Sequence, residues 1–401
     1  MRERWRQTTI DDACEISYGT RVIRKRDGGT IYPVYGGGGE TFRIDRFNRE
    51  DCTIVSRFGM SESCVRHVSG KFFLNDSGLS VAPKNAKNLY PPYLDYFLYA
   101  SQRAIYSLGR GLAQKNLDVK GFRNLEISYP GDLTEQKRIV AILDEAFAGI
   151  ATAVANTEKN LTNARELFES YLNAVFTETP NNWMERKLGD ICTIKHGFAF
   201  KSKYFSESGD YIVLTPGSFF EYGGFRDQGD KTKYYTGDVP DGFILEKDDF
   251  LIAMTEQAAG LLGSSLIVPE ADLYLHNQRL GRVRVREDFE WHNDFFFHQF
   301  NTTRFRDAVQ VTASGVKVRH TSPTKLEAIY VEVPPDKTEQ ESIADRLNDL
   351  LEERRRLERI ARQKLTALAE LKQSVIQKAF SGELTAGKET PKVTLKEEEV
   401  P

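Results

Sequence analysis

The fold follows from Thr134–Phe176 read together with Thr338–Phe380. The first segment begins TEQKRIVAILDEAF and ends ESYLNAVF, and the second begins TEQESIADRLNDLL and ends KQSVIQKAF. A shift of 204 residues places Gln136 on Gln340 and Phe176 on Phe380 without a gap. The chain is therefore an internal duplication, and we expect each copy to end in the same kind of element.

Both segments are predicted to be long helices. Glycine and proline are nearly absent from them, and apolar residues recur at spacings of three and four. The first apolar seam comprises Phe147, Ile150, Val154, Leu161, Ala164, Phe168, Tyr171 and Val175. The second comprises Leu347, Leu350, Leu357, Ala361, Leu368, Leu371 and Val375, with Arg354 and Lys364 as interruptions. Asp132 with Glu135, and Asp336 with Glu339, are candidate helix-start signals.

A helix of this length needs a partner along its whole seam. At about 1.5 Å per residue it would measure roughly 65 Å, which is too long for a small local core to cover. We expect the two seams to pack on each other as an antiparallel coiled coil, although the pattern alone also allows a parallel pair or two helices buried separately.

The rest of the chain falls into two mixed α/β domains, so the predicted class is α+β with a pseudo-two-fold duplication. Trp5, Cys14 and Gly19 recur as Trp183, Cys192 and Gly197 at a shift of 178, so the second copy has gained 204 − 178 = 26 residues before its helix. The predicted boundaries are 1–133 for the first domain, 134–179 for the central helix, 180–337 for the second domain, 338–381 for the distal helix and 382–401 for a disordered tail.

The charge is unevenly distributed along the chain. The net charge is -3, but residues 1–133 hold 20 basic against 15 acidic side chains, or +5, and residues 180–337 hold 19 against 23, or -4. Within the second domain, Leu273–Leu326 carries nine basic and five acidic side chains. Phosphate binding depends on the local number of cations, so basic faces fit a nucleic-acid partner, and a solvated mixed-charge surface remains an equal alternative.

We find no strong catalytic or cofactor signature. The four cysteines form no CxxC pair and the six histidines have no metal-ligand spacing, which predicts reduced thiols, no metal and a cytoplasmic location. No signal peptide and no apolar run of membrane length is expected. Gly36–Gly39 lacks the GxGxxG spacing. Tyr90–Tyr93 reads YPPY, but an adenine-N6 methyltransferase motif needs Asp or Asn at its first position.

A glycine-led loop precedes each long helix. At the shift of 204, Gly111 matches Gly315, Lys115 matches Arg319 and Asn116 matches His320. Basic and amide side chains suit phosphate contacts and base edges, and glycine permits a close backbone approach. The recurrence of this loop at the same distance from both helices indicates a shared binding role.

Taken together, residues 1–381 resemble the DNA-specificity subunit of type I restriction-modification systems. The resemblance rests on two divergent domains, the TEQ-initiated helices, the glycine-led loops and the ending AFSGEL. It implies a non-catalytic subunit without a cofactor, in which each domain reads half of an asymmetric split site on double-stranded DNA. It also implies that the helices set the spacing and bind two adenine methyltransferase subunits, which two translocase-nuclease subunits can join.

Candidate DNA-contacting residues follow from the loops and the charge. They are Arg43, Arg57, Gln114, Lys115, Asn116 and Lys120 in the first domain, and Thr255, Gln257, Arg279, Lys317, Arg319 and His320 in the second. Lysine and arginine are expected to hold phosphates, whereas Gln114, Asn116 and Gln257 suit adenine edges. Alternatives are a methyltransferase-only complex, a fused methyltransferase or nuclease, and a helical scaffold that binds only proteins.

Overall fold

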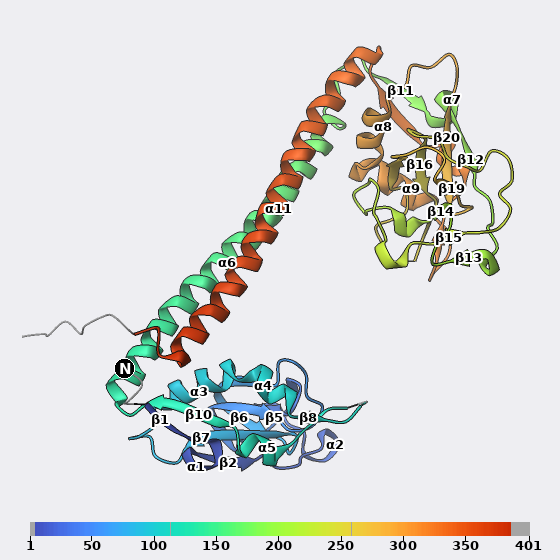
Figure 1. Ribbon diagram of the computed structural model, residues 1–401. Helices are drawn as coiled ribbons and strands as arrows, with labels where there is room; N and C mark the ends of the chain where they lie inside the picture. Colours follow the sequence, from blue (N-terminus) through green and yellow to red (C-terminus); the bar gives the residue numbers. More distant parts are fainter. Residues whose placement is uncertain (1–4, 113, 258, 386–401) are drawn as a thin grey trace, which may run out of the picture. The chain divides into compact units, whose positions relative to one another are not determined.

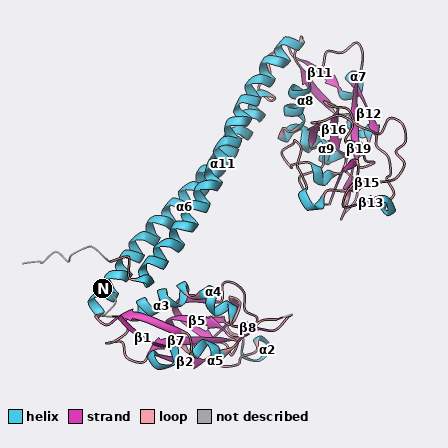
Figure 2. Cartoon of the chain, viewed as in Figure 1, coloured by secondary structure: helices cyan, strands magenta, loops and turns pink. Residues whose placement is uncertain are grey.

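The computed structural model describes residues 5–112, 114–257 and 259–385. The chain divides into unit 1, Met1–Thr157 with Arg362–Pro401, and unit 2, Glu158–Ala361. Each unit therefore combines one α/β domain with about half of each long helix. The strands lie in the α/β domains, as Figure 2 shows by colour. Of the predicted tail, residues 386–401 lie outside the described part, whereas Leu384 packs on the core of unit 1.

Unit 1 is built on a six-stranded sheet with the order β2-β7-β5-β6-β3-β4 (Figure 1). Its strands are β2 (Cys14–Tyr18), β3 (Tyr32–Tyr35), β4 (Glu40–Ile44), β5 (Arg49–Ser56), β6 (Val65–Leu74) and β7 (Gly78–Pro83). Two short pairs join β1 (Trp5–Thr9) to β10 (Glu126–Pro130) and β8 (Gly109–Arg110) to β9 (Asn116–Leu117). The helices are α1 (Ile10–Ala13), α2 (Arg24–Asp27), α3 (Pro91–Ala100), α4 (Gln102–Ser107) and α5 (Val119–Arg123).

Unit 2 has two four-stranded sheets, β12-β20-β16-β18 and β13-β15-β14-β19. The first contains β12 (Cys192–His196), β16 (Phe250–Ala253), β18 (Ser265–Ile267) and β20 (Leu280–Val285). The second contains β13 (Phe205–Ser206), β14 (Tyr211–Leu214), β15 (Tyr234–Tyr235) and β19 (Tyr274–His276). Short pairs join β11 (Met184–Lys187) to β22 (Tyr330–Val333) and β17 (Thr255–Glu256) to β21 (Arg319–His320). The helices are α7 (Leu188–Ile191), α8 (Asn293–Phe300), α9 (Thr303–Thr312) and α10 (Pro323–Glu327).

The duplication is visible in the strand register. Tyr18 pairs with Leu79 in unit 1, and His196 pairs with Gly281 in unit 2, so β2 with β7 corresponds to β12 with β20. Aromatic stretches form α3 and α8 in the two units, where Tyr93 and Phe295 are fully buried. In the same way β5 corresponds to β16, because β5 pairs with β7 and β16 pairs with β20.

The long helices are α6 (Leu133–Val175) and α11 (Lys337–Ser381). The backbone N–H of Thr134 donates to Asp132 Oδ1 at 2.9 Å, and that of Glu339 donates to Asp336 Oδ1 at 2.8 Å, which confirms the predicted start signals. One 18-residue window of α6 has a mean hydropathy of 1.5, so α6 does reach membrane length by composition, contrary to the expectation. Buried core helices of other proteins meet the same test.

The two helices run antiparallel within each unit. In unit 1, Lys372 Nζ lies 4.8 Å from the ring of Phe147. In unit 2, Arg165 donates to Glu358 at 2.9 Å, and Arg346 lies 5.3 Å from the ring of Tyr171. Numbers rise along α6 as they fall along α11, and Figure 1 shows the two helices side by side. The coiled-coil prediction is confirmed for the antiparallel orientation.

The predicted seam of α11 is partly wrong. Leu350, Leu357 and Leu371 are exposed on the outer face, whereas Arg354 and Glu358 are buried in the contact with α6. The guanidinium of Arg354 lies 4.8 Å from the rings of Phe168 and of Tyr222. Stacking on two aromatic rings and the neighbouring carboxylate make burial of this charge tolerable. The buried residues then follow alternating spacings of three and four: Gln340, Ala344, Leu347, Leu351, Arg354, Glu358 and Ala361.

Candidate nucleic-acid interface

The glycine-led loop of unit 1 is a tight hairpin. Arg110 on β8 pairs with Asn116 on β9, and Gly111 between them has a φ of 114°. A β-carbon on Gly111 would collide with the carbonyl oxygen of Gln114, so both the dihedral angle and the space require glycine here. The hairpin consequently presents Leu112, Gln114 and Asn116 as exposed side chains.

Unit 2 contains the same hairpin at the same shift. The backbone groups of Ser314 and His320 exchange two hydrogen bonds of 3.0 Å, and Gly315 has a φ of 101°. A β-carbon on Gly315 would collide with the carbonyl oxygen of Val318. The predicted equivalence of the two loops therefore extends to their strand register and to the glycine that closes the turn. Lys317 and His320 are exposed on this hairpin.

In unit 1 the structure brings together Arg57, Gln114, Lys115 and Asn116. The N–H of Met60 donates to the carbonyl of Lys115 at 2.9 Å, and that of Leu117 donates to the carbonyl of Arg57 at 2.8 Å. The loop that follows β5 is thus bonded to the hairpin on both sides. Arg57, Gln114, Lys115 and Asn116 form one surface, which we call the first reading loop cluster.

Aromatic rings hold the cations of this cluster. The Arg57 guanidinium lies 4.4 Å from the ring of Phe58 and 5.0 Å from that of Tyr18, and Lys115 Nζ lies 4.0 Å from the ring of Tyr106. Such stacking orients a cation without neutralising it, so both charges stay available to phosphates.

Arg43 and Lys120 lie outside the first reading loop cluster. Arg43 is on β4, where it donates to the carbonyl of Ile31 at 3.0 Å and pairs with Glu40 at 3.2 Å. Lys120 is exposed on α5. Both remain candidate phosphate contacts, but the geometry links neither to the hairpin.

In unit 2, Thr255, Arg279 and His320 line a shallow pocket of about 440 Å³. The N–H of Thr321 donates to the carbonyl of Met254 at 3.0 Å, which corresponds to the bond between Leu117 and Arg57 in unit 1. The N–H of Met254 in turn donates to the carbonyl of Arg279 at 2.9 Å. Three distant segments therefore converge here. We call the exposed surface of Thr255, Arg279, Lys317 and His320 the second reading loop cluster.

The sequence prediction missed one position in each cluster. His196 lines the pocket of unit 2, and its counterpart at the shift of 178 is Tyr18, on which Arg57 stacks. Both residues end a strand immediately before a matched glycine, Gly19 or Gly197, whose β-carbon would collide with the carbonyl oxygen of Asn75 or Asn277. The recurrence of this glycine is the sequence signal that could have identified Tyr18 and His196 as candidates.

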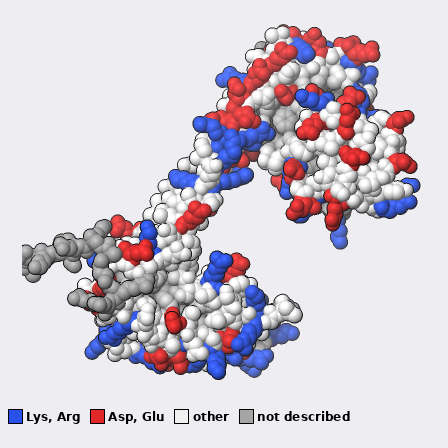
Figure 3. All heavy atoms as spheres, in the orientation of Figure 1, with Lys and Arg blue, Asp and Glu red and all other residues white. Residues whose placement is uncertain are grey.

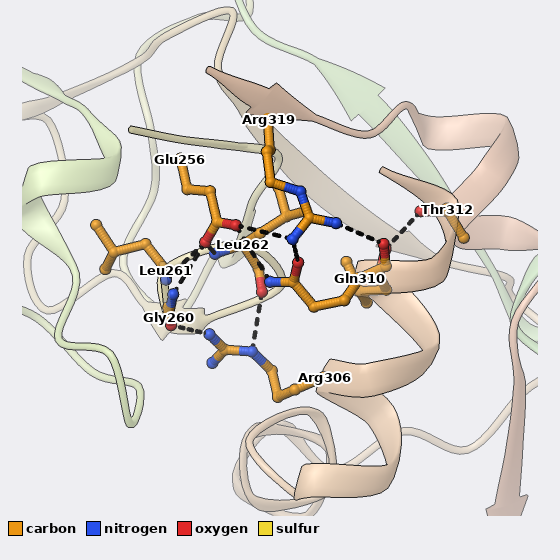
Figure 4. Close-up of polar contacts among 9 residues, drawn as sticks. Glu256, Gly260, Leu261, Leu262, Arg306, Gln310, Thr312 and Arg319 are labelled. Atoms are coloured by element: carbon orange, nitrogen blue, oxygen red, sulfur yellow. Dashed lines mark hydrogen bonds and ion pairs between the residues drawn. The ribbon is translucent and has the colours of Figure 1, made fainter. Parts of the chain in front are cut away.

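Arg319 differs from the other candidates because its guanidinium is engaged internally. It donates to Gln310 Oε1 and, at 3.0 Å, to the Gln310 carbonyl, and it lies 3.7 Å from Glu256 Oε1. Figure 4 shows it directed toward these groups. These bonds indicate that Arg319 positions the hairpin. It also remains a candidate phosphate contact.

Glu256 and Arg306 hold the loop that carries Gln257. The buried carboxylate of Glu256 accepts hydrogen bonds through Oε2 from the backbone N–H groups of Gly260, Leu261 and Leu262, at 3.1, 3.1 and 2.9 Å. Arg306 donates from the other side to the carbonyls of Gly260 and, at 2.9 Å, Leu262 (Figure 4). Burial lowers the pKa of Arg306 to about 10, so it stays charged at neutral pH. Gln257 is exposed and directly follows Glu256.

Basic side chains also gather on the surface of unit 1 at α2. Figure 3 shows Lys and Arg gathered on the side of unit 1 where Figure 1 labels α2, whose residues include Arg24, Lys25 and Arg26. A local concentration of cations of this kind is what phosphate binding requires. Among the described residues, no group of three or more His, Cys, Asp or Glu side chains could hold a metal ion.

Comparison with known proteins finds relatives over most of the chain. Residues 2–162 and 180–367 match the family model described as type I restriction modification DNA specificity domain. The EcoBI type I restriction enzyme specificity subunit of Escherichia coli is 28% identical over 230 residues, which span 56% of this chain and 44% of that protein. The MjaVIII specificity subunit of Methanocaldococcus jannaschii is 24% identical over 310 residues, spanning 70% of this chain and 69% of that protein.

Solved structures share the fold. One solved chain comes from a structural study of complex assembly and conformational transition of the type I R-M system. It has a TM-score of 0.73 at 16% identity, and the match covers 95% of this chain and 99% of that one. The HsdS subunit from Thermoanaerobacter tengcongensis has a TM-score of 0.54 at 16% identity, with 95% and 98% covered.

Proposed function

Since the chain belongs to the family of type I restriction-modification DNA specificity proteins, we propose that it reads a split DNA site for a methyltransferase complex without catalysing a reaction itself. The observation that carries this proposal is the matched pair of hairpins around Gly111 and Gly315. They share a register and a turn but carry different side chains, as expected for two readers with different target sequences.

Each reading loop cluster recognises one half of the site on double-stranded DNA. Lys115, Arg57, Arg279 and Lys317 bind phosphates, because phosphate contacts set the register of a protein on the duplex. Gln114, Asn116 and Gln257 present amides that can bond the N6 and N7 edge of adenine in the major groove. The two halves differ because the clusters differ, so the full site is asymmetric.

The long helices set the distance between the half-sites and bind two adenine methyltransferase subunits. An antiparallel pair of equivalent helices presents two equivalent surfaces, so two copies of one partner can bind it. Two translocase-nuclease subunits can join this core in the cytoplasm. A methyltransferase-only complex is the alternative, since both assemblies use the same specificity subunit.

The proposal is tested by binding measurements on the chain in complex with its methyltransferase subunit. We expect specific, salt-dependent binding to DNA that carries both half-sites, and transfer of methyl groups only when the methyltransferase is present. Methyl transfer by the isolated chain would favour a fused enzyme. A complex with no salt-dependent affinity for DNA would favour the protein-only scaffold.

A further inference from the structure

The tips of the two hairpins carry apolar residues that are almost fully exposed. Leu112 and Val316 have relative exposures of 109% and 98%, the highest values among the exposed large hydrophobic residues of the described chain. They are 204 residues apart, so they occupy the same place in the duplication, directly after Gly111 and Gly315. Two domains with otherwise divergent loops thus present a branched apolar side chain at the same point.

The hairpin geometry holds these side chains away from the domain. The pairing of Arg110 with Asn116, and of Ser314 with His320, closes each loop just below its tip. The left-handed glycine then turns the chain so that the next residue protrudes. A fully exposed leucine or valine does not stabilise the free protein, because an apolar side chain contributes to stability only when its surface leaves water.

The surroundings of the tips favour DNA over protein as the surface that covers them. An apolar protein-docking patch usually comprises several neighbouring residues. Leu112 lies among amide and basic groups such as Gln114 and Lys115, and Val316 lies beside Lys317 with one further exposed apolar residue on its hairpin, Val318, at 41% exposure. A duplex offers the complementary arrangement, with an apolar base stack between rows of phosphates. Apolar side chains of this size wedge between base steps in proteins that kink DNA.

We propose that Leu112 and Val316 are wedge residues that insert into the base stack of their half-sites. This inference rests on the proposed function, because it needs the hairpins to face DNA. Each wedge partly unstacks one base step, the duplex bends at that point, and the cost of swinging the target adenine out of the duplex falls. Flexible pyrimidine–purine steps are the expected insertion points.

The test uses the full chain with its methyltransferase subunit and duplex DNA in which 2-aminopurine replaces the target adenine. The variants are Leu112→Ser, Val316→Ser and the double variant, with Leu112→Met as the conservative control and Lys115→Ala as the phosphate control. Both wedge positions are fully exposed, so unfolding midpoints should match the unmodified chain.

We expect the unmodified complex to raise 2-aminopurine fluorescence in each half-site, and each serine variant to lose that rise in its own half only. Affinity for the specific site should fall roughly tenfold or more in the double variant, with an unchanged salt slope. Leu112→Met should keep the rise. Lys115→Ala should instead lower the salt slope.

Serine variants that match the unmodified complex in both fluorescence and affinity would overturn the wedge. So would a loss of methyltransferase binding in the absence of DNA, because the tips would then contact protein. If the unmodified complex binds no DNA at all, the proposed function fails first, and that outcome is distinct from normal binding without unstacking.

Discussion

Gln136 and Gln340, 204 residues apart, make equivalent hydrogen bonds at the starts of the two long helices. The N–H of Tyr90 donates to Gln136 Oε1 at 2.7 Å, and the N–H of His292 donates to Gln340 Oε1 at 3.0 Å. Tyr90 and His292 are the N-cap residues immediately before α3 and α8. The glutamine of each TEQ sequence therefore fastens a long helix to the α/β domain of its own unit.

Replacing Gln136 with alanine should destabilise unit 1. The side chain is fully buried and also donates to the carbonyls of Asn88 and Pro130, at 2.8 and 2.7 Å. Its loss leaves three backbone groups without their partner, which costs about 2 to 4 kcal/mol. Urea unfolding followed by hydrogen–deuterium exchange of the amides of unit 1 would report this change. Exposed Gln114→Ala should shift the midpoint little, and an equal shift in both variants would argue against the role of Gln136.

Lys115 and Gln114 should affect DNA binding in different ways. Lys115→Ala should weaken binding to all sequences and reduce the slope of log affinity against log salt by about 1, because one phosphate contact is lost. Gln114→Ala should leave the slope unchanged and relax preference at one base pair of the first half-site. Titrations at several salt concentrations on matched and mismatched duplexes measure both quantities. Identical effects of the two substitutions would contradict the assignment.

Glu256→Ala should destabilise unit 2 and disturb only the second half-site. The substitution leaves three backbone N–H groups unpaired and removes the carboxylate beside Arg319, at a cost of about 3 to 5 kcal/mol. Urea unfolding followed by hydrogen–deuterium exchange of the amides of unit 2, together with competition binding on each half-site, would test this. Exposed Glu287→Ala is the matched control. Equal loss in both half-sites would mean that the effect is not local to the loop.

Unit 2 should lose stability as the pH falls from 6.5 to 4. Burial lowers the pKa of His298 to about 4, and its ring donates to Asn348 Oδ1 at 2.8 Å. The folded state keeps this ring neutral, while the unfolded chain takes up a proton below about pH 6.5. The contribution of His298 to the free energy of unfolding is therefore fully present above pH 6.5. It falls by about 3 kcal/mol between pH 6.5 and pH 4.

The matched variants are His298→Gln and His320→Gln, which change a buried and an exposed ring. His298→Gln should flatten the dependence of the unfolding free energy on pH, and His320→Gln should leave it as in the unmodified chain. His276, whose pKa burial also lowers to about 4, keeps part of the dependence in both variants. An unchanged pH dependence in His298→Gln would count against the buried neutral ring.

The sequence predicted the elements that repeat and misjudged the polar residues that become buried. Helix periodicity and the shift of 204 were enough for α6, α11 and the glycine-led hairpins. Arg354 was predicted to interrupt the α11 seam, but it lies in the contact with α6, because its stacking partner Tyr222 comes from a distant loop. Charge pattern alone does not show such a partner.

Some residues of the candidate interface could not be predicted from the sequence. The loops around Gln114 and His320 were predicted because they recur. The network of Glu256 and Arg306 was not, because its members are 50 residues apart and most of its bonds are to backbone groups that no side-chain pattern encodes. Tyr18 and His196 were missed because only their neighbouring glycines recur.

The central claim is that two different domains each read one half of a split site. The most direct test is to map methylated adenines across the genome of cells that express this chain with its adenine methyltransferase subunit. We predict one asymmetric motif, made of two short defined halves around a spacer of fixed length, with a methylated adenine in each half. A single uninterrupted motif, or a palindromic one, would contradict the account.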